Sequence, residues 1–289
     1  MSKAFGFSRL LKPGEQQDAQ EFLGLFLDQL HEEIVQYAAG QGGRDRGSGL
    51  PPMMNGDAYT GGTGGGGGVP KSSVVTGMFY GMFRSEGKKG TYSSITLEPF
   101  HCLQLDLGLP QSSPRPGVSH GSETANGPRR GGAAWGGAGV EWTTGPKATV
   151  LDEALAAFFA GEVKAPRKLT LERAPQVLTL HLIQFEYDAK LGSTKKLGRR
   201  VRYPLELTIP QHGMSPSLVR SSPGPLRYRL FAVVLHHGRS LHGGHYTALV
   251  RDARGQWRHC DDQHVSPETE VHALNPKSGH PYLLLYTRL

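Results

Sequence analysis

Apolar and polar positions form their most regular pattern near the end of the chain, in residues 228–262. The first part, YRLFAVVLHH, is apolar at nearly every position, which favours a strand covered on both faces. After the turn-rich residues GRSLHGG, the run His245–Val250 favours a second strand, and Gln256–Asp261 favours a third. The pattern therefore predicts a hairpin with one arm that begins at His245 and another that ends at Asp261 and Asp262.

The length of the hairpin turn decides which carboxylate meets His245. A three-residue loop that ends on Gly255 in the left-handed conformation would put Asp261 on the face of His245, one diagonal step away. A four-residue loop would bring Asp262 directly opposite His245, because a slip of one residue exchanges the faces. Either carboxylate could orient the imidazole as a general base requires. A packed or solvated pair without a catalytic role would show the same spacing.

The rest of the chain mixes helical and strand patterns. Residues 15–37 carry apolar side chains at helical spacing, with Asp18 as a candidate cap and Gly40 as the expected stop. Residues 150–159 predict a short helix. Regular structure is expected to resume at residue 73, with the alternating leucine pattern of a strand in LQLDL, and residues 167–209 predict strands. Together these patterns predict the α+β class with a mostly antiparallel sheet.

Two stretches interrupt this order, residues 40–70 and residues 109–138. Both are rich in glycine, and the second is also rich in proline and serine. Such segments bury too little apolar surface to offset the entropy of ordering, so we expect disordered insertions. The glycines lack the lysine-serine/threonine spacing of a phosphate-binding loop.

Length and composition limit the number of domains, the kinds of partner and the cellular compartment. The 289 residues can form one large or two small domains. The net charge of +7 comes from scattered residues, which favours a solvated surface over a nucleic-acid-binding arm. Two cysteines rule out a disulfide framework and a cysteine-rich zinc site, and they favour a reducing compartment. With no apolar leader or membrane-length run, we expect the cytoplasm or nucleus and no membrane partner.

Three sequence segments, QQDAQEFL, GGHYTALV and WRHCDDQHV, resemble the glutamine and histidine boxes of the ubiquitin-specific proteases, which are cysteine deubiquitinases. The resemblance implies a papain-like α+β fold with palm, fingers and an incomplete thumb, and it makes residues 1–289 a partial catalytic domain. It also implies thiol-dependent hydrolysis of peptide and isopeptide bonds at the ubiquitin C-terminus. Ubiquitin and ubiquitinated proteins would be the partners.

The resemblance also assigns roles to individual residues. His245 matches the general base, Asp261 the third member of the triad and Asp262 the second acid beside it. A second set would bind substrate near the channel for the ubiquitin tail: Asp18, Gln17, Gly244 and Tyr246. A carboxylate suits a tail that contains arginine, because it accepts charge-assisted hydrogen bonds.

The family's nucleophilic cysteine precedes the glutamine box, and its signature does not occur in this sequence. Cys102 shares a strand face with the carboxylate of Asp106, and Cys260 should point away from Asp261, so neither is expected to replace it. We therefore expect the C-terminal part of a catalytic domain that is inactive by itself. No cofactor is expected, and EGKKG at residues 86–90 stands where a first pair of zinc ligands would be, so no zinc is predicted.

Three other functions are compatible with the sequence. The chain could be a non-catalytic ubiquitin-binding protein that keeps the palm and fingers. An RNA-associated protein could use the glycine-arginine segments, and its binding would depend steeply on salt. Metal-assisted hydrolysis could use a set of four histidines: His236, His237, His242 and His245.

Overall fold

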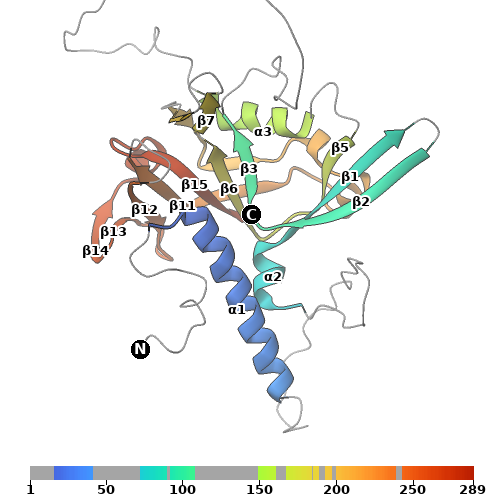
Figure 1. Ribbon diagram of the computed structural model, residues 1–289, viewed down its shortest axis with the longest axis horizontal. Coiled ribbons are helices and arrows are strands. Elements are labelled where there is room, and N and C mark those ends of the chain that lie inside the picture. Colours follow the sequence, from blue (N-terminus) through green and yellow to red (C-terminus); the bar gives the residue numbers. More distant parts are fainter. Residues whose placement is uncertain are drawn as a thin grey trace, which may run out of the picture.

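The computed structural model describes residues 16–41, 72–89, 92–107, 149–160, 167–183, 185–188, 193–196, 200–238 and 243–289. An eight-stranded sheet forms the centre of the molecule (Figure 1). Its strands run in the order β14 (His264–Glu268), β13 (Trp257–Asp261), β12 (His245–Arg251), β11 (Arg227–His237), β15 (His280–Arg288), β6 (Val177–Ile183) and β3 (Leu103–Asp106), with β10 (Glu206–Thr208) paired to β11. Neighbouring strands are antiparallel except β3 and β6. The predicted α+β class with a mostly antiparallel sheet is confirmed.

A second sheet extends from this centre. It has the order β2 (Tyr92–Phe100), β1 (Gly81–Lys89) and β5 (Arg167–Arg173). Figure 1 shows the β1–β2 hairpin reaching away from the central sheet, as expected for the fingers. Two short pairs complete the strands, β4 (Thr149–Val150) with β9 (Val201–Arg202) and β7 (Phe185–Asp188) with β8 (Ser193–Lys196).

The predicted helices form with shifted ends. Helix α1 (Ala19–Gln41) begins four residues later than residue 15, because the Asp18 carboxylate accepts hydrogen bonds from the first free backbone amides. It also passes residue 37 and ends beyond Gly40. Helix α3 (Leu151–Ala160) lies within one residue of its predicted range.

Three short helices complete the description, α2 (Val74–Phe79), α4 (Pro216–Ser221) and α5 (Glu270–Leu274), with a 3-10 turn at Gln211–Gly213. Ser73 caps α2 in a capping box with Thr76. Helices α1 and α2 lie side by side below the central sheet in Figure 1. The His31 ring joins them, with Nδ1 2.8 Å from the hydroxyl of Ser73.

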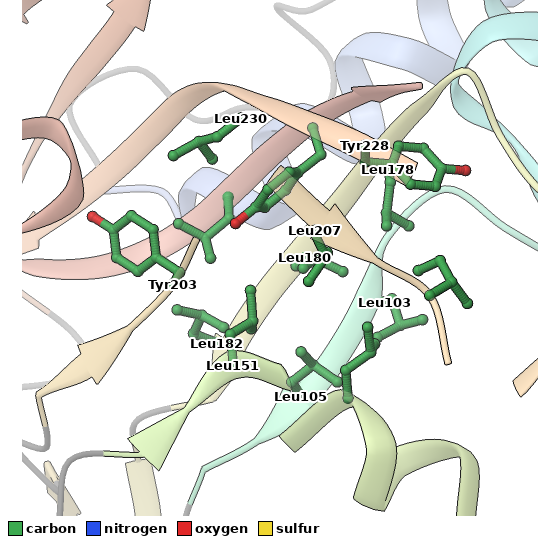
Figure 2. Packing of buried hydrophobic residues seen from close by; sticks show 14 of the residues in the cluster. Leu103, Leu105, Leu151, Leu178, Leu180, Leu182, Tyr203, Leu207, Tyr228 and Leu230 are labelled. Atoms are coloured by element: carbon green, nitrogen blue, oxygen red, sulfur yellow. The ribbon is translucent and has the colours of Figure 1, made fainter. Parts of the chain in front are cut away.

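The core lies between the central sheet and α3 (Figure 2). Leu103 and Leu105 are buried while Gln104 and Asp106 are exposed, so the predicted alternation is confirmed. Two buried phenols of this core have partners: the Tyr228 hydroxyl donates to the Pro175 carbonyl at 2.7 Å, and the Tyr203 hydroxyl donates to the Ala273 carbonyl at 2.7 Å. The polar ends of these aromatic side chains are therefore satisfied inside an otherwise apolar cluster.

The glycine- and proline-rich stretches predicted as insertions lie outside the described residues, except for residues 40 and 41 at the end of α1. Among the helices that the structure describes, none is long and apolar enough to cross a membrane.

Candidate active site

The hairpin of β12 and β13 has the register that the three-residue loop predicts. The Asp252 amide donates to the Gln256 carbonyl at 2.8 Å, and Gly255 adopts a φ of 81°. The strand pairing continues to Ala248 opposite Cys260. The next residue of β13, Asp261, therefore lies on the same face as His245 and one diagonal step away.

His245 and Asp261 are in direct contact. His245 Nε2 lies 2.5 Å from Asp261 Oδ1, and the two side chains are 45% and 47% exposed. Asp262 follows with a φ of 50° at the turn into β14, where left-handed backbone suits a short polar residue. One ligand atom each from His245, Asp261 and Asp262 lies within 4.8 Å of the other two. The structure thus brings the predicted base and both predicted acids together.

The pKa values of both His245 and Asp261 are shifted from their usual values. The hydrogen bond to Asp261 raises the pKa of His245, and the charges of Asp261 and Asp262 add to this effect. The hydrogen bond from His245 lowers the pKa of the Asp261 carboxyl. The pair therefore favours imidazolium and carboxylate together, and Nδ1 is the ring nitrogen left to exchange a proton with another group.

A second histidine, which the sequence did not single out as part of the pair, lies beside His245. His237 is paired with His245 across β11 and β12, and their ring centroids are 6.1 Å apart. Its Nε2 lies 2.8 Å from the Thr247 hydroxyl. Gly279, with a φ of 74°, leaves room for this ring, since a Cβ there would lie 2.7 Å from Cε1 of His237. Only the strand register reveals this neighbour, because residues that are paired directly opposite each other on adjacent strands lie on the same face.

Asp18, a predicted substrate-binding residue, has its carboxylate occupied by bonds within the chain. Oδ1 accepts from the amides of Gln20 and Glu21 at 2.7 and 3.1 Å. Oδ2 accepts the hydroxyl proton of Tyr282, and the Tyr246 ring lies 5.4 Å from the Tyr282 ring. The carboxylate is therefore part of the helix cap and of a tyrosine pair before any substrate binds.

The other predicted substrate-binding residues lie around His245. Gly244 and Tyr246 precede and follow it directly, and the Gly244 amide donates to Gln16 Oε1 at 3.0 Å. Gln17, the predicted glutamine, is half-buried next to Gln16 in the approach to α1. The glutamine that contacts the histidine segment is thus the neighbour of the predicted one, and the QQD sequence alone does not distinguish them.

The two cysteines lie away from the imidazole. Cys260 pairs with Ala248, an odd number of residues from His245, so its side chain is on the opposite face of β12 and β13. Burial raises the pKa of the Cys102 thiol to about 12. Neither thiol is placed to give a proton to His245.

The four histidines considered for a metal do not form one cluster among the described residues. His236 is 4% exposed and packs against Tyr246 at 4.9 Å between ring centroids, on the face opposite to His245. His242 lies outside the described residues. The described group that could share a cation is instead His245, Asp261 and Asp262.

Comparison with known proteins agrees with this geometry. The family model described as ubiquitin carboxyl-terminal hydrolase matches residues 3–286. The chain is 33% identical to probable ubiquitin carboxyl-terminal hydrolase 3 of Schizosaccharomyces pombe and 32% identical to ubiquitin carboxyl-terminal hydrolase 10 of Rattus norvegicus. These matches cover 96% and 97% of the chain. The chain spans 57% and 35% of the length of these two relatives.

Solved structures share the fold at lower identity. The SAGA Ubp8/Sgf11/Sus1/Sgf73 DUB module bound to ubiquitin aldehyde matches with a TM-score of 0.59 and 22% identity, over 95% of this chain and 50% of that chain. A SAGA DUB module bound to monoubiquitin matches with a TM-score of 0.61 and 20% identity, over 98% of this chain and 51% of that chain. The palm and fingers arrangement is therefore a fold that solved structures also contain.

Proposed function

Because the chain belongs to the ubiquitin carboxyl-terminal hydrolase family, we propose that it carries the histidine–aspartate half of a thiol-dependent deubiquitinase. The substrate would be the peptide or isopeptide bond that joins the ubiquitin C-terminus to another protein. The contact between His245 Nε2 and Asp261 Oδ1, 2.5 Å long and on an exposed face, carries this proposal. Solvent exposure is what a base needs to reach a substrate, whereas a packing role would favour burial of the ring.

In the proposed reaction a cysteine thiol gives its proton to His245, and the thiolate attacks the carbonyl carbon of the last ubiquitin residue. The imidazolium returns the proton to the departing amine, so the C–N bond breaks and a thioester remains. His245 then takes a proton from water, whose attack on the thioester releases the ubiquitin carboxylate and regenerates the thiol. Asp261 would hold Nε2 throughout and stabilise the imidazolium, and Asp262 would add a second negative charge.

The substrate side of the proposal keeps the four residues named from the sequence. Gly244 and Tyr246 flank the base. Asp18 and Gln17 lie just before α1, and their neighbour Gln16 accepts the proton of the Gly244 amide. An arginine of the ubiquitin tail would have to exchange with the hydroxyl of Tyr282 to bind Asp18 directly.

A second candidate function is non-catalytic ubiquitin binding. It is favoured by the placement of the two cysteines, since Cys260 lies on the opposite face and the pKa of Cys102 is raised to about 12. A reaction through His245 would then need a thiol that this sequence does not contain.

The proposal also covers domain organisation and location. Residues 1–289 would be part of a catalytic domain with insertions at residues 40–70 and 109–138. The protein would act in the cytoplasm or nucleus, where a chain with two unpaired cysteines stays reduced.

The test titrates residues 1–289 with isotope-labelled ubiquitin and, in parallel, incubates the protein with ubiquitin joined to a fluorophore. We expect saturable binding and no hydrolysis, with no adduct to a thiol-reactive ubiquitin probe. Absence of ubiquitin binding would refute the proposal. Hydrolysis that is lost in His245→Ala but kept in His212→Ala, an exposed histidine of the 3-10 turn, would support the enzyme and overturn the second candidate.

A further inference from the structure

Both chain neighbours of His245 are tied to the start of α1. The Gly244 amide donates to Gln16 Oε1 at 3.0 Å, a contact between residues 228 positions apart. On the other side, the Tyr246 ring lies 5.4 Å from the ring of Tyr282, whose hydroxyl donates to Asp18. Figure 1 shows the start of α1 near β15, the strand that contains Tyr282. The base therefore lies between two anchors from the same distant segment.

The anchoring segment is itself held in place. The Oδ1 atom of Asp18 caps α1 through two backbone amides, while Oδ2 accepts the hydroxyl of Tyr282 on β15. Rotation of this carboxylate would leave helix amides without acceptors, which is unfavourable. Helix α1, β12 and β15 thus share one polar junction, in which Tyr282 is buried and Asp18 and Tyr246 are half-buried.

His245 needs such anchors because it is the first residue of β12. Its pairing with β11 ends at His237, and its pairing with β13 begins only at Ala248. The end of a strand that lacks a partner on one side opens more readily than its middle. The contact of His245 with Asp261 across that unpaired end depends on where the backbone of residues 244–246 lies.

We propose that Gln16 and Asp18 are positioning residues for His245. Together with Gly244, Tyr246 and Tyr282 they form a junction, here named the α1 clamp, that fixes the backbone on both sides of the base. The clamp sets the contact between His245 and Asp261 without touching either side chain. A displacement of the start of α1 then weakens this contact, so a partner that binds there alters the protonation of the base. The inference rests on the proposed function only for the statement that His245 is the base.

The test compares Gln16→Ala with Gln17→Ala in the 289-residue chain. Gln16 bonds to Gly244, whereas Gln17 is its chain neighbour and provides a matched control. We expect the Gly244 amide to exchange with solvent roughly five- to tenfold faster in Gln16→Ala, since one hydrogen bond is lost. In the same variant the pKa of His245, followed by its imidazole proton shifts, should fall toward its usual value. Gln16→Glu, which keeps an acceptor oxygen, should restore the slow exchange of the Gly244 amide.

A merely structural glutamine would not change the titration of His245. Equal amide exchange and equal His245 titration in Gln16→Ala and Gln17→Ala would overturn the inference. Tyr282→Phe, which removes only the hydroxyl that Asp18 accepts, provides a second route to the same shift if Gln16→Ala folds poorly. Neither readout needs ubiquitin or a nucleophile, so a failure of the proposed function in the ubiquitin titration leaves these results interpretable.

Discussion

Replacement of Gly244 by alanine should push the start of β12, which carries His245, away from β11. A Cβ at this position would lie 2.3 Å from His236 Nε2 and 2.6 Å from the His237 carbonyl oxygen. The His236 ring is 4% exposed and packs against two tyrosines, so it has little room to rotate. The carbonyl belongs to the backbone of β11, and hence the strand itself must move.

The size of the effect follows from overpacking. Extra carbon in a filled site costs about 1–3 kcal/mol. For a chain of this size each kcal/mol lowers the melting temperature by about 2–4 °C, so we expect Gly244→Ala to melt about 2–12 °C below the parent protein. Measured against His236→Ala as the parent, Gly244→Ala should cost less but should still destabilise, because the carbonyl contact at 2.6 Å remains.

Scanning calorimetry provides the measurement, and Gly77→Ala is the control. A Cβ on Gly77 meets nothing within 4 Å, and the residue lies inside α2. Alanine there should therefore be neutral or stabilise by up to about 1 kcal/mol. If Gly244→Ala melts at the same temperature as the parent, the close approach of the two strands at this glycine is not a constraint and our reasoning fails.

Four further predictions concern the His245–Asp261 pair, here called the dyad, the core and a thiol. Asp261→Asn should lower the pKa of His245 in an NMR titration, since the amide cannot stabilise the imidazolium; an unchanged titration would contradict the assigned pairing. In the parent, the raised pKa of His245 stabilises the fold fully below pH 6.5, the usual pKa of histidine, and this stability is lost as the pH rises through the folded-state pKa. The lowered pKa of Asp261 stabilises the fold above pH 3.8, the usual pKa of aspartate, and this stability is lost as the pH falls. Chemical denaturation should therefore show the full contribution of the pair between pH 3.8 and pH 6.5. Leu180→Ala, fully buried between β15 and β3, should cost about 2–5 kcal/mol in the same assay. Its control Leu97→Ala, 48% exposed, should cost far less, and equal losses would contradict the described core. Desolvation raises the pKa of the Cys102 thiol to about 12, so iodoacetamide near pH 8 should alkylate it after the other cysteine in a timed mass-spectrometric digest. Faster labelling of Cys102 would show that its thiol is not desolvated.

Local sequence patterns were sufficient for the hairpin and its dyad. The alternation of β12 and β13 and a glycine suited to the left-handed conformation determine the register, and the register determines which acid meets His245. These are short-range properties, because a loop of three residues connects the two strands. Local patterns therefore predicted that Asp261 or Asp262 would reach the ring, and the observed three-residue loop selects Asp261.

The environment of the dyad was not predictable in the same way. The bond from Gly244 to Gln16 and the bond from Tyr282 to Asp18 join segments that are far apart in sequence. Which of the two adjacent glutamines makes the contact depends on the direction of the chain before α1, and periodicity contains no information about this direction. The same limit explains why α1 begins at Ala19, since the cap competes with a helical pattern that continues further back.

The dyad does not need a nucleophile in order to form. Its two side chains come from adjacent strands of one hairpin, and its charge state follows from their mutual hydrogen bond. Preorganised groups lower a barrier because their orientation is fixed before the reacting atom arrives. A thiol brought to the exposed face of His245 would therefore meet a base already aligned by Asp261, and the remaining requirement would be its distance from Nδ1. The α1 clamp matters for this reason, since it places the backbone of the base by contacts that no local pattern could supply.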